Sequence, residues 1–94
     1  MFRTEIEISK KAKKEIVKLP KEVVKKLRFW IKEVNLIGLR EVRKIKSFHD
    51  EPLQGDRQGQ RSIRLNKAYR AFYVVNKNRE IELVEIIEIN KHKY

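Results

Sequence analysis

Residues 60–89 read QRSIRLNKAYRAFYVVNKNREIELVEIIEI, and their pattern is the strongest indication of the fold class. It is rich in β-branched and aromatic residues, and two short polar segments, 66–67 and 76–78, divide it. Apolar runs separated by turn residues are typical of strands joined by hairpins. We therefore predict an antiparallel meander of three strands, over 60–65, 69–75 and 80–89.

The last strand of this meander has apolar residues at both odd and even positions. Strict alternation would place Val84 and Ile86 on one face, and on the other Ile81, Leu83, Ile87 and Ile89. Burial on both faces is expected of a central strand. Residues 2–8 also alternate apolar and polar side chains, so we predict a further strand there, paired beside the last one.

Apolar residues at helical spacing fill the region between the first strand and the meander. Ser9 can cap a short basic helix whose apolar face continues to Leu19. Pro20 suits the first turn of a second, longer helix, which ends near Gly38 and places Trp30 in the core. Residues 39–46 are compatible with one or two further helical turns.

Residues 47–60 read as a loop, because Pro52, Gly55 and Gly59 stand there among polar side chains. A loop of this length is uncommon in a small domain and is often functional. The order of elements is then β-α-α-β-β-β. We predict an α+β fold for residues 1–94 as a single domain, with two N-terminal helices packed on one face of a small, antiparallel-rich sheet.

The composition limits the classes of function. Lys and Arg number 24 against 13 Asp and Glu, for a formal charge of +11, which predicts attraction to a polyanion and salt-dependent binding. The absence of cysteine excludes disulfides and thiolate metal sites. Since no apolar run could span a membrane and residues 1–5 lack a secretory signal pattern, we expect a cytoplasmic protein without membrane contact.

Acidic residues offer no clear metal site. Asp50, Glu51 and Asp56 lie in one loop without matching ligands elsewhere, so we expect neither a metal nor another cofactor.

Arginines are spaced through the loop and the meander at Arg57, Arg61, Arg64 and Arg70. Because alternate residues of a strand share a face, Arg64 would lie on the side opposite the core-facing Ile63 and Leu65. Two arginines on adjacent strands can hold a phosphate with forked hydrogen bonds that a lysine cannot match. Arg64 and Arg70 therefore form a candidate phosphate clamp.

Residues 51–73, EPLQGDRQGQRSIRLNKAYRAFY, resemble the signature of the RelE/ParE superfamily of toxins, and most of all its HigB and YoeB types. Those toxins carry a similar E-P-L-x-G stretch in the loop before a strand that ends in R-(I/L)-N. Residues 90–94, NKHKY, also resemble the His- and Tyr-bearing C-termini of these proteins. The resemblance follows the element order of the whole chain, and its specific part begins at His49.

The resemblance implies the fold of these toxins and the activity of a ribosome-dependent messenger-RNA interferase. It implies that Arg70 is the catalytic arginine of the third-strand motif and that Arg64, at the end of the preceding strand, joins it on the scissile phosphate. Glu51 lies where the YoeB type has its candidate general base. His92 and Tyr94, separated here by one residue, lie in the region of the catalytic terminal His and Tyr.

Cleavage of RNA without a metal uses the neighbouring 2′-hydroxyl as nucleophile, so it needs a base, a stabiliser of the phosphorane charge and an acid. Arg70 and Arg64 would stabilise the charge. Glu51 or His92 would be the base and His92 or His49 the acid, with Tyr94 orienting the substrate or stacking on a nucleobase. Further RNA contacts would come from Lys67, Arg61, Arg57 and His49.

The implied partners are the ribosome, messenger RNA and an antitoxin encoded next to the toxin, typically a helix-turn-helix DNA-binding protein in the HigB branch. Two alternatives stay open. A ParE-like toxin shares the fold but binds DNA gyrase, and it would not need His92 or Tyr94. A basic RNA-binding protein without cleavage activity would keep most of its affinity after Arg70→Ala, whereas a nuclease would lose rate by orders of magnitude.

Overall fold

The computed structural model describes residues 3–78 and 80–91. Five strands form one sheet in the order β1-β5-β4-β3-β2. They are β1 (Arg3–Ile8), β2 (Glu51–Pro52), β3 (Arg61–Arg64), β4 (Tyr69–Lys77) and β5 (Ile81–Lys91). Strand β1 runs parallel to β5, and the other neighbours are antiparallel. The predicted α+β class, the meander and the pairing of the first strand with the last are confirmed.

Three helices lie between β1 and β2: α1 (Lys10–Ile16), α2 (Lys21–Ile37) and α3 (Leu39–Val42). Ser9 caps α1 as predicted, because its hydroxyl accepts a hydrogen bond from the Ala12 amide at 3.1 Å. Pro20 lies at the N-cap of α2, one residue before the first turn, and Gly38 ends that helix with φ +86°. The further helical turn expected in 39–46 is α3.

The apolar stripe of α2 packs against one face of the sheet and makes the core. Its buried residues are Val23, Leu27, Trp30 and Val34. Trp30 is fully buried, as predicted, and its ring lies 5.1 Å from that of Tyr73 on β4. The sheet side of the core comes from Ile63, Ala71, Tyr73, Val84, Ile86 and Ile89. Helix α2 does not cover the opposite face of β3, β4 and β5, which we call the open face.

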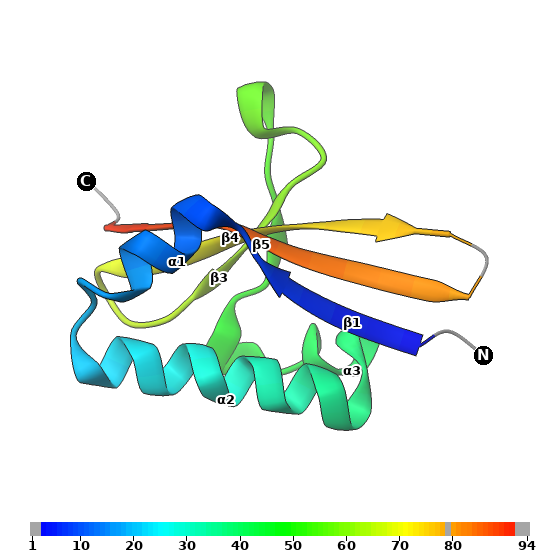
Figure 1. Cartoon of the computed structure of the whole chain (residues 1–94), viewed down its shortest axis with the longest axis horizontal. Helices are drawn as coiled ribbons and strands as arrows, with labels where there is room; N and C mark the ends of the chain where they lie inside the picture. Colours follow the sequence, from blue (N-terminus) through cyan, green and yellow to red (C-terminus); the bar gives the residue numbers. More distant parts are fainter. Residues whose placement is uncertain (1–2, 79, 92–94) are drawn as a thin grey trace.

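The prediction that residues 47–60 form only a loop is wrong. They contain β2 and two 3-10 turns, η1 (Lys46–Phe48) and η2 (Gly55–Arg57). Strand β2 has two residues, one of them Pro52, and it lies at the sheet edge, where proline is tolerated. Figure 1 shows the segment with η2 rising on the side of the sheet away from α2.

The predicted faces of β5 are partly wrong because the strand contains a β-bulge. Phe72 pairs with Glu88 whereas Tyr73 pairs with Ile86, which leaves Ile87 as the extra residue. The bulge shifts the alternation by one, so Ile89 shares the core face with Val84 and Ile86. Its consequence is that Glu88 and Asn90 face away from the core.

Candidate functional site

Cross-strand pairing brings Arg64 and Arg70 together on the face opposite the core. Arg64 on β3 lies directly across from Arg70 on β4, and Arg70 lies across from Asn90 on β5. Directly opposed residues have Cβ atoms about 5 Å apart and on the same face. The chain thus places two like charges side by side, an arrangement that costs stability unless an anion compensates it.

Arg70 is held in place by one oxygen from β2 and one from β3. Its Nη1 donates to Glu51 Oε1 at 3.3 Å and to Ser62 Oγ at 3.2 Å. The Arg70 side chain is 18% exposed, whereas that of Glu51 is 56% exposed. A guanidinium set in the sheet therefore lies next to a carboxylate that solvent or a ligand can reach. Ser62 has no counterpart among the residues expected from the sequence.

Arg64 has no ion pair with any residue of 3–78 or 80–91, and the ion-pair partner of Arg70 is the single carboxylate of Glu51. The excess positive charge of this pair makes the face an attractive place for an anion. Two forked donors on adjacent strands also match the geometry of a phosphate. The structure thus brings together three expected site residues: Arg64 and Arg70, expected on the phosphate, and Glu51, expected as the general base.

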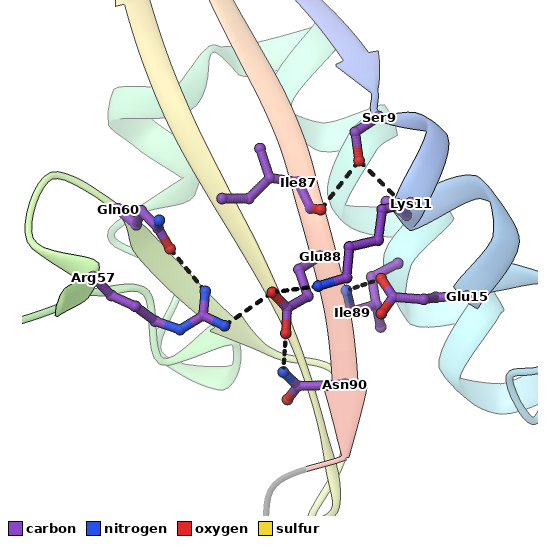
Figure 2. Close-up of polar contacts among 10 residues, drawn as sticks. Ser9, Lys11, Glu15, Arg57, Gln60, Ile87, Glu88, Ile89 and Asn90 are labelled. Atoms are coloured by element: carbon purple, nitrogen blue, oxygen red, sulfur yellow. Dashed lines mark hydrogen bonds and ion pairs between the residues drawn. The ribbon is translucent and has the colours of Figure 1, made fainter.

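A second cluster lies on the same face, where Arg57, Lys11 and Asn90 converge on Glu88 (Figure 2). The Arg57 guanidinium covers the Phe72 ring at 4.1 Å and donates to Glu88 Oε1 at 2.9 Å. Lys11 reaches the same Glu88 oxygen at 3.1 Å, and Asn90 donates to the other one. The hydrogen bond from Arg57, helped by Lys11 and Asn90 against the effect of burial, lowers the pKa of Glu88 to about 2.

Arg61 lies on the core side of the sheet and not with the other arginines. Its Nε donates to Asp50 Oδ1 at 2.6 Å, and the Asp50 side chain is 0% exposed. Tyr73 donates its hydroxyl hydrogen to the other Asp50 oxygen. Burial opposes the charge of Arg61, but the contact with Asp50 outweighs it and raises the pKa of Arg61. Arg61 therefore has a buried structural partner, and its contact with RNA stays a prediction.

The remaining expected residues lie at the rim or outside the described part. Lys67 is exposed at the tip of the β3–β4 turn, where Asn66 Oδ1 accepts from two backbone amides at 2.8 Å. His49 is exposed two residues before Glu51 and has left-handed backbone angles, φ 45° and ψ 50°. His92 and Tyr94 lie outside the described residues.

Within residues 3–78 and 80–91, no three His, Asp or Glu side chains gather so that they could hold a metal ion. No helix in that same part of the chain is long and apolar enough to cross a membrane.

The sequence matches no family model and no curated protein, but solved structures share its fold. A YoeB/ParE toxin from Agrobacterium tumefaciens aligns with a TM-score of 0.73 at 18% identity over 95% of this chain and 99% of that one. YafQ from E. coli strain BL21(DE3) aligns with a TM-score of 0.71 at 20% identity, covering 95% and 93%. YoeB in a complex with YefM from Staphylococcus aureus aligns with 0.70 at 23%, covering 97% and 99%. The chain has the fold of the YoeB and YafQ toxins.

This YoeB/YafQ-type fold is the one that the resemblance of residues 51–73 implied. Several residues of its open face were not expected from the sequence: Ser62, Phe72, Glu88 and Asn90. Strand alternation already places Ser62 on the face of Arg64, two residues further along, but it does not show the contact with Arg70. Glu88 and Asn90 could not, because the bulge at Ile87 reverses their faces.

Proposed function

We propose that this chain is the toxin of a type II toxin–antitoxin system and that it cleaves translated messenger RNA on the ribosome without a metal ion. The observation that carries the proposal is the direct pairing of Arg64 with Arg70, with Glu51 3.3 Å from Arg70. The full-length likeness to the YoeB and YafQ toxins and the formal charge of +11 support it.

In this proposal the two arginines bind the scissile phosphate and stabilise the phosphorane. Preorganised positive charge is often the largest contribution to such a rate, because charge develops on the phosphate oxygens in the transition state. Ser62 and the Glu51 carboxylate orient Arg70, so its guanidinium needs little reorganisation when the substrate binds.

Glu51 is the proposed general base. It accepts the proton of the 2′-hydroxyl, whose oxygen attacks the phosphorus and forms a 2′,3′-cyclic phosphate while the bond to the 5′-oxygen breaks. The departing 5′-oxygen takes a proton from an acid, for which His92 and His49 are the candidates. The exposed side of Glu51 suits this role because the substrate hydroxyl must come within hydrogen-bond reach of it.

The proposed partners are the ribosome with its messenger RNA and an adjacently encoded antitoxin of the helix-turn-helix type. Solved complexes of similar fold pair YafQ with DinJ and YoeB with YefM, and these support an antitoxin partner here. An acidic antitoxin surface would complement the basic surface of this chain. A ribosome-bound substrate places the proposed activity in the cytoplasm.

The test is a cell-free translation reaction with one labelled messenger, whose ends are mapped by primer extension. We expect cuts with the wild-type protein only when ribosomes are present. Arg70→Ala should lower the cleavage rate by at least about a hundredfold, because one preorganised donor set is lost. Arg28→Ala, an exposed substitution on α2, is the matched control and should keep the wild-type rate.

Intact messenger with folded wild-type protein would contradict the proposal. The same preparation would then be added to a gyrase supercoiling assay and to an RNA-binding assay. Inhibition of gyrase would favour the ParE-like alternative. Binding without cleavage, only modestly weakened by Arg70→Ala, would favour the RNA-binding alternative.

A further inference from the structure

Asp50 is a buried carboxylate at the start of the candidate site. Its side chain is 0% exposed, and each of its two oxygens has a different donor. Arg61 Nε on β3 donates to Oδ1 at 2.6 Å, and the hydroxyl of Tyr73 on β4 donates to Oδ2. A carboxylate this deeply buried persists only when such donors compensate its lost hydration. Asp50 thus ties the chain before β2 to two strands at once.

The tie extends into the helical layer. Arg43, the residue that follows α3, donates from its Nε to the Tyr73 hydroxyl oxygen at 3.4 Å, and the Tyr73 ring packs 5.1 Å from Trp30 of α2. Burial of Tyr73, followed by its hydrogen bond to Asp50, raises the pKa of its hydroxyl. The hydroxyl therefore stays a donor to Asp50 at neutral pH. The contacts that hold Asp50 therefore extend through Tyr73 to Trp30 in the core.

The residue after Asp50 is Glu51, which points the other way. Successive side chains of an extended chain lie on opposite faces, so Asp50 reaches into the core side while Glu51 reaches Arg70 on the open face. Strand β2 has only two residues, and its register pairs are Glu51 with Ser62 and Pro52 with Arg61. So short a strand needs an anchor beyond its own ladder.

We propose that Asp50 is the positioning residue that sets the Glu51 carboxylate against Arg70. The expected effect of Asp50 on the cleavage rate rests on the proposed function. Its expected effect on the surroundings of Arg70 rests on geometry alone. Asp50 does not touch the substrate in this account. It acts through the position of Glu51.

The test compares three substitutions in the full chain. Asp50→Asn keeps the size of the side chain but turns an amide or a single oxygen toward two donors, so it loses the contact with Arg61 or with Tyr73. Asp56→Asn is the matched control, because Asp56 is an exposed carboxylate nearby. Tyr73→Phe removes one of the two hydrogen bonds and keeps the ring against Trp30.

The first readout is kinetic. Asp50→Asn should lower kcat about tenfold to a hundredfold with little change in KM, because a displaced catalytic group affects the chemical step more than binding. In a Glu51→Gln background the same substitution should lower kcat less than about twofold, since the group it positions is already inactive. Additive effects in this double-mutant cycle would overturn the proposal.

The second readout does not depend on cleavage. The Nε–Hε resonance of Arg70, assigned by its loss in Arg70→Lys, should shift in Glu51→Gln and shift in the same direction in Asp50→Asn, while Asp56→Asn leaves it in place. A wild-type resonance in folded Asp50→Asn would overturn the positioning role. If Asp50→Asn does not fold, Tyr73→Phe takes its place. A smaller shift of the Arg70 resonance in the same direction would support the proposal, and no shift would overturn it.

The two readouts separate the two claims. Shifts of the Arg70 resonance in a protein that never cuts messenger would support the role of Asp50 and contradict the proposed function. Cleavage that needs Arg70, together with an Arg70 resonance unmoved by Asp50→Asn, would support the function and overturn the role of Asp50.

Discussion

Glu88 accepts contacts from Arg57, Lys11 and Asn90, and these lower its pKa to about 2 although burial alone would raise it. Because the unfolded pKa lies near 4.3, the ionised Glu88 stabilises the fold fully above that value. This contribution is lost as pH falls from about 4.3 through about 2. We expect Glu88→Gln to lower the free energy of unfolding by about 1 to 2 kcal/mol at pH 7. This figure is smaller than the full pKa shift implies, because solvent screens the partly exposed Arg57 and Lys11.

Thermal unfolding of the wild-type protein and of Glu88→Gln between pH 7 and pH 2 checks this prediction. The difference in unfolding free energy should shrink to nearly zero at the acidic end, while Asp56→Asn reports the effect of losing an exposed carboxylate. A difference that stays constant with pH would mean that the Arg57–Glu88 pair does not stabilise the fold.

His49 adopts left-handed backbone angles, φ 45° and ψ 50°, which cost a residue with a Cβ about 1 kcal/mol. His49→Gly removes that cost, although glycine also gains freedom in the unfolded chain. We expect a net stabilisation of about 0.5 kcal/mol by urea denaturation, and none for His49→Ala. A less stable glycine variant would show that the imidazole itself stabilises the loop. His49→Gly also tests His49 as the general acid. A stable variant that no longer cleaves messenger would show that the imidazole is needed for cleavage and not for the fold.

Single residues of the candidate site were predictable where strand periodicity governs them. Alternation along β3 places Arg64 away from the core, and the hairpin then brings it to Arg70. Asp50 and Arg61 were not predictable, because a buried ion pair between a loop and a strand depends on how the loop folds back. From the sequence alone, Arg61 reads as one more exposed cation.

Helix α1 lies beside the part of β5 that β1 leaves unpaired, since β1 pairs only with 81–86. Two side chains at α1 form hydrogen bonds with backbone groups of β5 along this edge. Glu15 Oε1 accepts from the Ile89 amide at 2.8 Å, and the Ser9 hydroxyl donates to the Ile87 carbonyl at 3.1 Å (Figure 2). Glu15→Ala leaves the Ile89 amide without this acceptor, which should cost about 1 to 2 kcal/mol.

Denaturant unfolding and amide exchange together test this docking of α1. Glu15→Gln keeps an oxygen acceptor and should lose less than half as much stability as Glu15→Ala. Glu22→Ala, at an exposed position of α2, serves as the control. The Ile89 amide should exchange faster in Glu15→Ala. Unchanged exchange at Ile89 would show that Glu15 does not hold this edge.

Whole elements were predictable in kind but not in every detail. The cap at Ser9, the stop at Gly38 and the stripe of α2 each have a local cause, so the start of α1 and both limits of α2 agree with the prediction. Helix α1 ends at Ile16, before the Leu19 to which the helical spacing extends it. Strand β2 and the bulge at Ile87 have no local signal, since they arise from pairing with β3 and β4. Pairing across the sheet, and not propensity, decides both.

The architecture of the whole molecule followed from the order of its elements. As predicted, the first strand pairs beside the last, and α2 lies along one side of the sheet (Figure 1). The buried residues of α2 close the core there. That arrangement also determines which face stays open. The loop with η2 rises on this face, so the fold itself brings Arg57 and Glu51 to the same side as Arg70.

The formal charge of +11 belongs to the whole chain, and it predicts how strongly salt weakens binding to RNA. For single strands, each neutralised phosphate contributes about −0.7 to the slope of log K against log salt. With four or more contacts, affinity for a single-stranded oligonucleotide should fall more than tenfold between 50 and 200 mM salt. Fluorescence anisotropy across that range measures the slope.

Two variants locate the contacts that produce this slope. Arg64→Gln removes a cation from the open face and should make the slope shallower by about 0.7, whereas Lys32→Gln, on the exposed side of α2, should leave it unchanged. The reverse result would place the RNA on the helices and not on the sheet. Such a result would separate the polyanion-binding surface from the arginine pair, and the pair would then need a substrate delivered by the ribosome alone.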